Sequence, residues 1–433
     1  MEHERTNENN QPAWVMGKRI NEVKCAKEYM EAAGIVYADG AFFTVDGRIT
    51  DEVAMRKEIF DAISPYVTSG VMRRVEGVME ALRLVAYKEN FDNDITVMHF
   101  QNGTFDLSDR FSHQKSPCRY RLPVNYNPKA GQPVKWLEFL DQLLEPEDID
   151  TLQEYMGYCL IPTTKAQKML MIIGRGGEGK SRVGLVMKAL LGHCMSMGSL
   201  AKVETNAFAR ADLEHILLFV DDDMKMEGLP GTNYIKSIIT AEMPMDLERK
   251  GKQSYQGKLN ARFLAFGNGN LQALNDRSHG FFRRQIILQA KPRPADRVDD
   301  PYLGHALLKE TEQIMMWAMA GLFRLIGQDF QFTISDHAWN NLRDAVTQGN
   351  NIVSFMQSKG YFIFSKDGTV TSRRLYKAYM DWCDDNMITP LSANVFWNYF
   401  KQEAAFYHLK QTNHVSIGDG KEARGFIGLR IIR

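Results

Sequence analysis

The sequence from Met169 to Leu191 decides the fold, and it reads Met169-Leu-Met-Ile-Ile-Gly174-Arg-Gly-Gly-Glu-Gly-Lys180-Ser181 followed by Arg182-Val-Gly-Leu-Val-Met-Lys-Ala-Leu-Leu191. The first five residues are apolar and partly β-branched, which is typical of a short buried strand. The last ten carry apolar side chains at helical spacing. Between them lies the pattern G-x-x-x-x-G-K-[ST], in which glycines let backbone N–H groups curl around phosphate at a helix N-terminus. The stretch therefore predicts a strand, a phosphate-binding loop and a helix.

This loop predicts a nucleotide site that uses ATP and Mg²⁺. Lys180 is expected to reach the β- and γ-phosphates, and the Ser181 hydroxyl is expected to hold the magnesium ion. A chance match in a glycine-rich turn is the alternative, but the flanking strand and helix argue against it. The residues predicted to contact the nucleotide are Gly174, Gly176, Gly177, Glu178, Gly179, Lys180, Ser181 and Arg182.

A second apolar run, His215–Val220, stops at three consecutive carboxylates, Asp221, Asp222 and Asp223. Carboxylates at the carboxyl end of a parallel strand lie beside such a loop. Asp221 and Asp222 are therefore predicted to hold magnesium and to orient the attacking water. Which of the three carboxylates activates water stays open, and a solvated loop is the alternative interpretation.

A third run, Arg262–Phe266, ends at Gly267-Asn268, and an arginine pair, Arg283-Arg284, follows. An amide at this position can contact the γ-phosphate and the attacking water together, so Asn268 is a candidate catalytic residue; a simple turn is the alternative. Paired arginines are usually surface charge. A ring-forming ATPase, however, needs a guanidinium donated across the subunit boundary, which makes Arg283 and Arg284 candidate arginine fingers.

The order of these motifs resembles the A, B, B′ and C motifs of superfamily 3 helicases, in particular the phage and plasmid primase–helicases related to the poxvirus helicase–primase. The resemblance extends over about residues 95–433. Leu152–Pro162 resembles the family's lead-in helix, and Tyr376–Cys383 resembles the start of its C-terminal winged-helix domain. The segments Asn102–Leu107 and Leu122–Pro128 are similar to its small upstream domain.

The resemblance implies a hexameric ring that moves 3′→5′ on single-stranded DNA. Two departures stand out: Glu178 occupies a position where the family commonly has asparagine, and Asn268 is followed by Gly-Asn-Leu-Gln without the acidic residue and proline often found there. Members that make primers carry a polymerising domain upstream. Here Asp92 and Asp94 are the sole close acidic pair near a strand in that part of the chain. Primer synthesis is not expected, and a separate primase or initiator is the expected partner.

A basic segment, Glu248–Asn260, lies between the acidic strand and the asparagine strand, with Gly251 and Gly257 permitting a tight hairpin. In the resembling family this insertion lines the channel of the ring and grips the DNA backbone, and an exposed solvated hairpin is the alternative. A basic tail over residues 401–433 is a second candidate DNA contact, with protein docking as its alternative. The predicted DNA-binding residues of the hairpin are Arg249, Lys250, Lys252 and Lys258.

Composition excludes several classes of protein. The 433 residues hold 53 basic and 53 acidic side chains, so any phosphate contact must come from local patches. No apolar run approaches the ~18 residues of a membrane span, and the N-terminus lacks the apolar core of a signal peptide. Five scattered cysteines without a C-x-x-C spacing fit a reducing compartment rather than a disulfide scaffold. We expect a cytoplasmic protein without membrane partners.

The predicted fold class is α/β, with a P-loop, AAA+-like parallel-sheet ATPase core between a small N-terminal α+β domain and a C-terminal winged-helix domain. The expected boundaries are a disordered leader 1–12, the α+β domain 13–133, the core 134–300, a helical connector 301–350 and the winged-helix-like domain 351–433. Expected elements are hairpins over 40–47 and 95–107, helices over 51–84 (broken near 64–65), 134–144, 148–159 and 307–325, a hairpin tip at 366–368, helices 371–383 and 391–403, and a terminal hairpin around 418–420.

The sequence thus predicts an ATP-driven, ring-forming replicative DNA helicase of a phage, virus or mobile element. One alternative is a P-loop ATPase that loads or remodels replication proteins without unwinding. Another is an origin-binding initiator in which nucleotide only switches assembly. Strand displacement on a forked duplex distinguishes the helicase from the two alternatives. ATP turnover distinguishes the remodelling ATPase from the initiator.

Overall fold

The computed structural model describes residues 11–17, 19–89, 91, 94–108, 110–224, 231–241, 243–251, 253–268, 279–294, 298, 300–349, 351–418 and 421–432. Lys252, Asp92 and most of the expected leader lie outside these residues. The chain forms two compact units, one comprising residues 1–270 and 283–339 and the other residues 271–282 and 340–433.

The first unit begins with small sheets and three helices that form their own core. Asn21 and Asp51 cap α1 and α2 by accepting hydrogen bonds from Lys24 N and Val53 N. Trp14, Phe42, Ile59 and Leu82 are buried together between these elements. The hairpin predicted over 40–47 and the broken helix over 51–84 are confirmed. The elements are β1 (Val15–Met16), β2 (Arg19–Ile20), α1 (Glu22–Ala33), β3 (Val36–Ala38), β4 (Ala41–Thr44), β5 (Gly47–Arg48), α2 (Glu52–Ile63), η1 (Ser64–Tyr66) and α3 (Val71–Val85).

A four-stranded sheet follows, in the order β8-β7-β6-β9. Its hairpin turns at Asn102-Gly103, as the sequence predicts, and pairs Phe100 with Gly103. Phe100, Phe105 and Leu122 belong to the main hydrophobic core rather than to the N-terminal one. The strands are β6 (Val97–Phe100), β7 (Gly103–Asp106), β8 (Arg110–Ser112) and β9 (Arg121–Leu122).

The central sheet has five strands in the order β11-β12-β15-β10-β16. Every neighbouring pair in it is parallel, so the predicted parallel α/β sheet is confirmed. β15 therefore separates the strand before the glycine loop from the strand that ends in carboxylates. The strands are β10 (Met169–Gly174), β11 (Met195–Met197), β12 (Leu218–Met224), β15 (Arg262–Asn268) and β16 (Gln285–Gln289).

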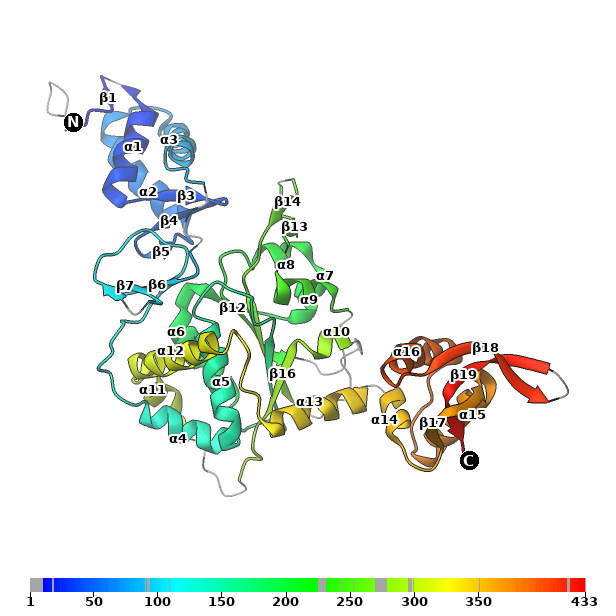
Figure 1. Cartoon of the computed structure of the whole chain (residues 1–433). Helices are drawn as coiled ribbons and strands as arrows, with labels where there is room; N and C mark the ends of the chain where they lie inside the picture. Colours follow the sequence, from blue (N-terminus) through cyan, green and yellow to red (C-terminus); the bar gives the residue numbers. More distant parts are fainter. Residues whose placement is uncertain are drawn as a thin grey trace. The chain divides into compact units, whose positions relative to one another are not determined.

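Helices cover both faces of this sheet (Figure 1). On one face, Ile172, Val220 and Phe266 pack in the same core as residues of α5, α6 and α12. On the other face the rings of Phe219 and Phe263 meet edge-on, 6.1 Å apart. The helices of this unit are α4 (Val134–Leu143), α5 (Pro146–Tyr158), α6 (Ser181–Leu191), α7 (Leu200–Thr205), α8 (Ala207–Ala211), α9 (Asn233–Thr240), α11 (Leu303–Leu308) and α12 (Thr311–Gly327), with η2 (Gly192–Cys194) after α6. The short helix α10 (His279–Phe282) belongs to the second unit.

α12 packs closely on α5, although the sequence suggests a connector after residue 301. A Cβ on Gly321 would lie 2.4 Å from Gln153 O, so only glycine allows this approach. Arg324 Nε donates to the fully buried Glu154 carboxylate at 2.6 Å, and Thr333 N donates to it at 2.7 Å. The helix predicted over 307–325 is broken between α11 and α12. There Glu310 accepts from the backbone N–H groups of Lys135 and Trp136 at the start of α4, at 3.0 Å each.

The second unit contains a three-stranded antiparallel sheet in the order β17-β19-β18 and an aromatic core that includes Phe355, Tyr379, Trp382 and Phe396. The helices predicted over 371–383 and 391–403 are confirmed, and so is the terminal hairpin, which β18 and β19 form. The predicted hairpin tip at Lys366–Gly368 is wrong, because β17 runs through it. α13 (Asp336–Gly349) spans the boundary of the units, and the remaining elements are α14 (Asn351–Gln357), β17 (Phe362–Thr371), α15 (Ser372–Asp385), α16 (Ala393–Phe406), β18 (Lys410–Gly418) and β19 (Lys421–Ile431).

The five cysteines are free and buried, as expected for a chain without a disulfide scaffold. In the described part of the chain, no helix combines the length and apolar character needed to cross a bilayer.

Candidate functional site

The glycine loop, Gly174–Ser181, joins the buried strand β10 to the first turn of α6. Gly176, Gly177 and Gly179 have positive φ angles of 107°, 83° and 104°, a conformation that side chains disfavour. The loop therefore turns back tightly and leads its backbone into the N-terminus of α6. A helix N-terminus presents N–H groups and a positive partial charge, which suit an anion.

Lys180 is buried at the end of this loop and is held by two side chains. Its Nζ donates to Glu178 Oε2 at 2.8 Å and to Asn268 Oδ1 at 3.1 Å. Asn268 is the last residue of β15 and lies directly across from Gly174 of β10 in the parallel register. The structure thus brings together two residues predicted to be catalytic, although 88 positions separate them in the chain.

Glu178 has only 3% of its surface exposed and accepts several hydrogen bonds within the loop. Gly176 N donates to both carboxylate oxygens, at 2.9 and 3.0 Å, and Arg175 N also donates to Oε1. Burial disfavours the charged carboxylate, but the bonds from Lys180 and the backbone outweigh it and hold the pKa of Glu178 below its usual value. Glu178 is therefore a charged, buried partner of Lys180.

The three carboxylates at the end of β12 face different surroundings. Asp221 is buried, and its Oδ2 accepts a hydrogen bond from Leu200 N, the first residue of α7, at 2.8 Å. Burial raises the pKa of the Asp221 carboxyl. Asp222 is exposed, and the pairing of β12 with β15 is irregular between Asp221 and Met224, so Asp222 lies in a bulged part of the strand with its carboxylate open to solvent. Asp222 is thus the better placed of the two predicted magnesium ligands.

Donor chemistry at this edge of the sheet fits magnesium bound to a nucleotide. Mg²⁺ is usually held by one or two protein oxygens together with substrate phosphates and water. Ser181, exposed at the start of α6, and Asp222 are the candidate protein ligands. Among the described residues no group of three or more His, Cys, Asp or Glu side chains is arranged to hold a metal by itself. Arg182 is turned elsewhere, because its guanidinium lies against Gly304 of α11.

The arginine pair lies at the opposite end of the same sheet. Arg284 O accepts from Met169 N at 2.8 Å, and Arg283 O accepts from Lys168 Nζ. These contacts place the pair beside the start of β10, whereas the glycine loop follows its end. Six strand residues correspond to roughly 17 Å. Arg283 and Arg284 are therefore not brought together with Lys180 within the chain.

A different arginine, Arg293, reaches the loop and was not identified from the sequence. A Cβ on Gly177 would lie 3.4 Å from Arg293 Nη1, so this guanidinium lies against the loop backbone. Arg293 follows β16, which is parallel to β10 and ends at the same edge. The sequence does show an arginine directly after an apolar strand, in Lys291-Pro-Arg-Pro294. That arginine can be assigned to the glycine loop only once β16 is known to pair with β10.

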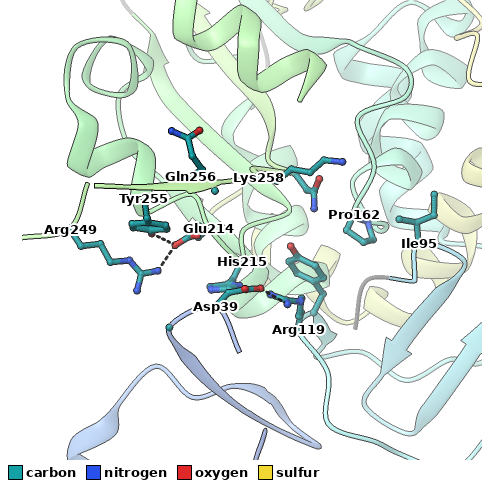
Figure 2. Close-up of a pocket in the computed structure, with 14 residues that line it drawn as sticks. Asp39, Ile95, Arg119, Pro162, Glu214, His215, Arg249, Tyr255, Gln256 and Lys258 are labelled. Atoms are coloured by element: carbon teal, nitrogen blue, oxygen red, sulfur yellow. Dashed lines mark hydrogen bonds and ion pairs between the residues drawn. The ribbon is translucent and has the colours of Figure 1, made fainter. Parts of the chain in front are cut away.

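The predicted DNA-binding hairpin is formed by β13 (Met245–Leu247) and β14 (Tyr255–Gly257), which pair antiparallel. Arg249 forms an ion pair with the buried Glu214, and Tyr255 OH donates to the same carboxylate at 2.5 Å (Figure 2). Arg249 is therefore engaged within the protein. Lys250 and Lys258 are exposed, whereas Lys252 lies outside the described residues.

Beneath this hairpin lies a cavity of about 690 Å³. Its lining includes Arg249, Lys258, the Asp39–Arg119 ion pair and His215 (Figure 2). Burial, together with Arg48, Arg119 and Arg249, lowers the pKa of His215 to about 3. His215 is consequently neutral at physiological pH, and the carboxylates Asp39 and Glu214 offset two of the cations in this region.

Comparison with known proteins gives a family match and structural neighbours. Residues 172–284 match a family described as a family of unknown function (DUF5906). That range nearly coincides with the stretch from the glycine loop to the arginine pair. Two solved apo structures of the NrS-1 C-terminal region are similar to this chain, each with a TM-score of 0.51 at 10% sequence identity. The matches cover 94% of this chain and 99% and 100% of the NrS-1 chains, which shows a shared fold.

Proposed function

We propose that this chain is an ATP-dependent, ring-forming DNA helicase that serves the replication of a phage, virus or mobile element. The observation that carries the proposal is the arrangement at the carboxyl edge of the central sheet. Buried Lys180 is hydrogen-bonded to Asn268 of β15, and exposed Asp222 lies near the carboxyl end of the neighbouring strand β12. A cation, an amide and a carboxylate at one sheet edge are the groups that ATP hydrolysis needs. The motif order that resembles superfamily 3 helicases supports the same assignment.

The positions of the arginine pair and the glycine loop, at opposite ends of the sheet, support the proposal of an oligomer. Arg283 and Arg284 precede β16 and cannot reach the glycine loop of their own subunit across roughly 17 Å. In a head-to-tail ring each subunit presents one surface to the next, so an arginine can complete a neighbour's site. We therefore propose ATP and Mg²⁺ as cofactors, a hexamer as the assembly, and DNA, together with a separate primase or initiator, as partners.

Two further details of the proposal come from the resemblance. The C-terminal unit runs helix, strand, two helices and hairpin, an order that suits a winged-helix domain. Lys250 and Lys258 are exposed on and beside the β13–β14 hairpin, where they are free to meet a phosphate backbone. We propose that these lysines grip single-stranded DNA, with 3′→5′ movement as the family resemblance implies.

The deciding experiment measures ATP hydrolysis and fork unwinding by the purified chain, with Lys180→Ala as the inactive reference. We expect DNA-stimulated hydrolysis and strand displacement by the parental chain and neither by the variant. Hydrolysis without strand displacement would favour a remodelling ATPase. Nucleotide binding without turnover would favour an initiator. Equal turnover in the parental chain and the variant would reject the active site itself.

A further inference from the structure

The glycine loop already contains an anion, which is the side chain of Glu178. Its carboxylate accepts hydrogen bonds from two backbone N–H groups, of Arg175 and Gly176, and from the ammonium of Lys180 at 2.8 Å. Backbone N–H groups and a lysine are the donors with which such loops hold phosphate. The side chains of Glu178 and Lys180 are 3% and 6% exposed, so this pair is shielded from water.

The fit of the carboxylate depends on a specific glycine. A Cβ on Gly174 would lie 2.8 Å from all three carboxyl atoms of Glu178, a distance that real Cβ atoms do not tolerate. The absence of a side chain at Gly174 thus leaves the space that the carboxylate fills. The Glu178 side chain is thus held in one position by the backbone N–H groups of the loop, by Lys180 and by the space beside Gly174.

Lys180 has three donors, and two are already directed at Glu178 and Asn268. The phosphates of a bound triphosphate also need Lys180. They meet an ammonium whose charge is already neutralised by the Glu178 carboxylate, which is negative like the phosphates. Two anions cannot share one ammonium in a buried site without mutual repulsion. Nucleotide binding therefore requires Glu178 either to release Lys180 or to weaken its hold on it.

We propose that Glu178 is an internal competitor of the nucleotide phosphates, which holds Lys180 in the empty site and must yield it when nucleotide binds. This inference rests on the proposed nucleotide site. In it, Glu178 is a positioning residue that acts through Lys180 and sets how readily nucleotide enters and leaves. An uncharged asparagine, which the resembling family commonly has at this position, would not compete in this way.

The test compares the affinity of the full-length chain for MgADP, measured by titration calorimetry, with that of Glu178→Gln. Glutamine keeps the length of the side chain and an acceptor oxygen but removes the charge. In Glu178→Gln the charge-assisted hydrogen bond from Lys180 to Glu178 no longer opposes nucleotide binding. Its loss corresponds to about a tenfold or greater decrease in the Kd for MgADP. We expect ADP to dissociate more slowly from the variant in the same proportion.

Glu204→Gln is the matched control. Glu204 is also a buried glutamate that accepts backbone hydrogen bonds, from Asn233, Tyr234 and Ile235 at the start of α9. It contacts none of the residues assigned to the nucleotide. Its substitution should lower the unfolding temperature and leave MgADP affinity unchanged. If Glu178→Gln fails to fold, Glu178→Asn provides a second uncharged variant with the same expected tightening.

The outcomes separate this inference from the function on which it rests. Tighter MgADP binding by a folded, uncharged Glu178 variant supports internal competition. Unchanged or weaker binding, with a parental chain that binds MgADP normally, overturns the inference and leaves the nucleotide site standing. If neither the parental chain nor the variant binds MgADP, the proposed nucleotide site and the competition both fail.

Discussion

Replacing the arginine pair tests whether one subunit completes the active site of the next. In Arg283→Ala/Arg284→Ala both guanidinium groups are removed, while their backbone carbonyls still accept from Met169 and Lys168. The fold should therefore persist, and the glycine loop at the far end of β10 should still bind ATP. We expect hydrolysis to be lost because the charge that develops on the γ-phosphate is no longer stabilised.

The size of the effect follows from the geometry. The pair is roughly 17 Å from the loop of its own subunit, so its contribution must come from a neighbour. An arginine finger contributes about 10³–10⁵ in kcat, so the variant alone should show no measurable turnover. Mixed in equal amounts with Lys180→Ala subunits, random rings contain about one intact interface in four, since each interface needs Lys180 from one subunit and arginine from the next. Activity should recover to about a quarter of the parental value.

The assay is steady-state ATP hydrolysis of each variant alone and of the mixture, with native mass spectrometry to verify mixed rings. Arg373→Ala/Arg374→Ala, an exposed arginine pair on α15, is the matched control and should keep parental turnover. Mixed rings without recovery of activity would refute donation in trans. Parental turnover by Arg283→Ala/Arg284→Ala would show that the pair takes no part in hydrolysis.

Four further predictions concern the remaining groups. Asp222→Asn should retain ATP binding and lose hydrolysis, whereas Asp221→Asn should mainly lower thermal stability; calorimetric binding and turnover of both variants decide this. Lys250→Ala/Lys258→Ala should lower the log–log salt slope of single-strand binding by roughly 0.7 per lost phosphate contact, while basal hydrolysis persists; an unchanged slope would contradict a DNA contact. Arg324→Met should destabilise the chain by about 3 kcal/mol in urea denaturation, because Glu154 stays buried without its cation. Since the folded pKa of His215 is about 3, the unfolded chain binds a proton first as pH falls below about 6.5, and stability should drop by about 2 kcal/mol at pH 5; His215→Gln should remove that slope.

Local sequence signals were sufficient where one segment determines its own structure. The glycine loop and its flanking strand and helix depend on residues adjacent in the chain, and so does the Asn102-Gly103 turn. The carboxyl ends of β12 and β15 were also predictable, because apolar runs that stop at polar residues mark strand ends. Given a parallel sheet, those ends must share an edge, which brings Asn268 near Lys180.

Features that depend on partners distant in the sequence were not predictable. Lys366–Gly368 looks like a turn, yet β17 continues through it, and Gly368 is needed because a Cβ there would lie 2.7 Å from the backbone of Leu429. Arg249 has the local pattern of a free basic residue, but it pairs with Glu214, which lies 35 positions away in the chain. Arg293 gains its place beside Gly177 only from the pairing of β16 with β10. In each case the local pattern is the same with or without the partner.

The proposal of a head-to-tail ring rests on the positions of two groups of residues at opposite ends of the central sheet. Lys180, Asn268 and Asp222 gather at the carboxyl edge, and the parallel register fixes that edge relative to β16. Because Arg283 and Arg284 precede β16, the same register holds them at the amino edge. No side-chain rotation spans a strand of six residues. In the proposed ring, a head-to-tail neighbour brings its arginine pair to a glycine loop that already has Arg293 of its own chain beside Gly177.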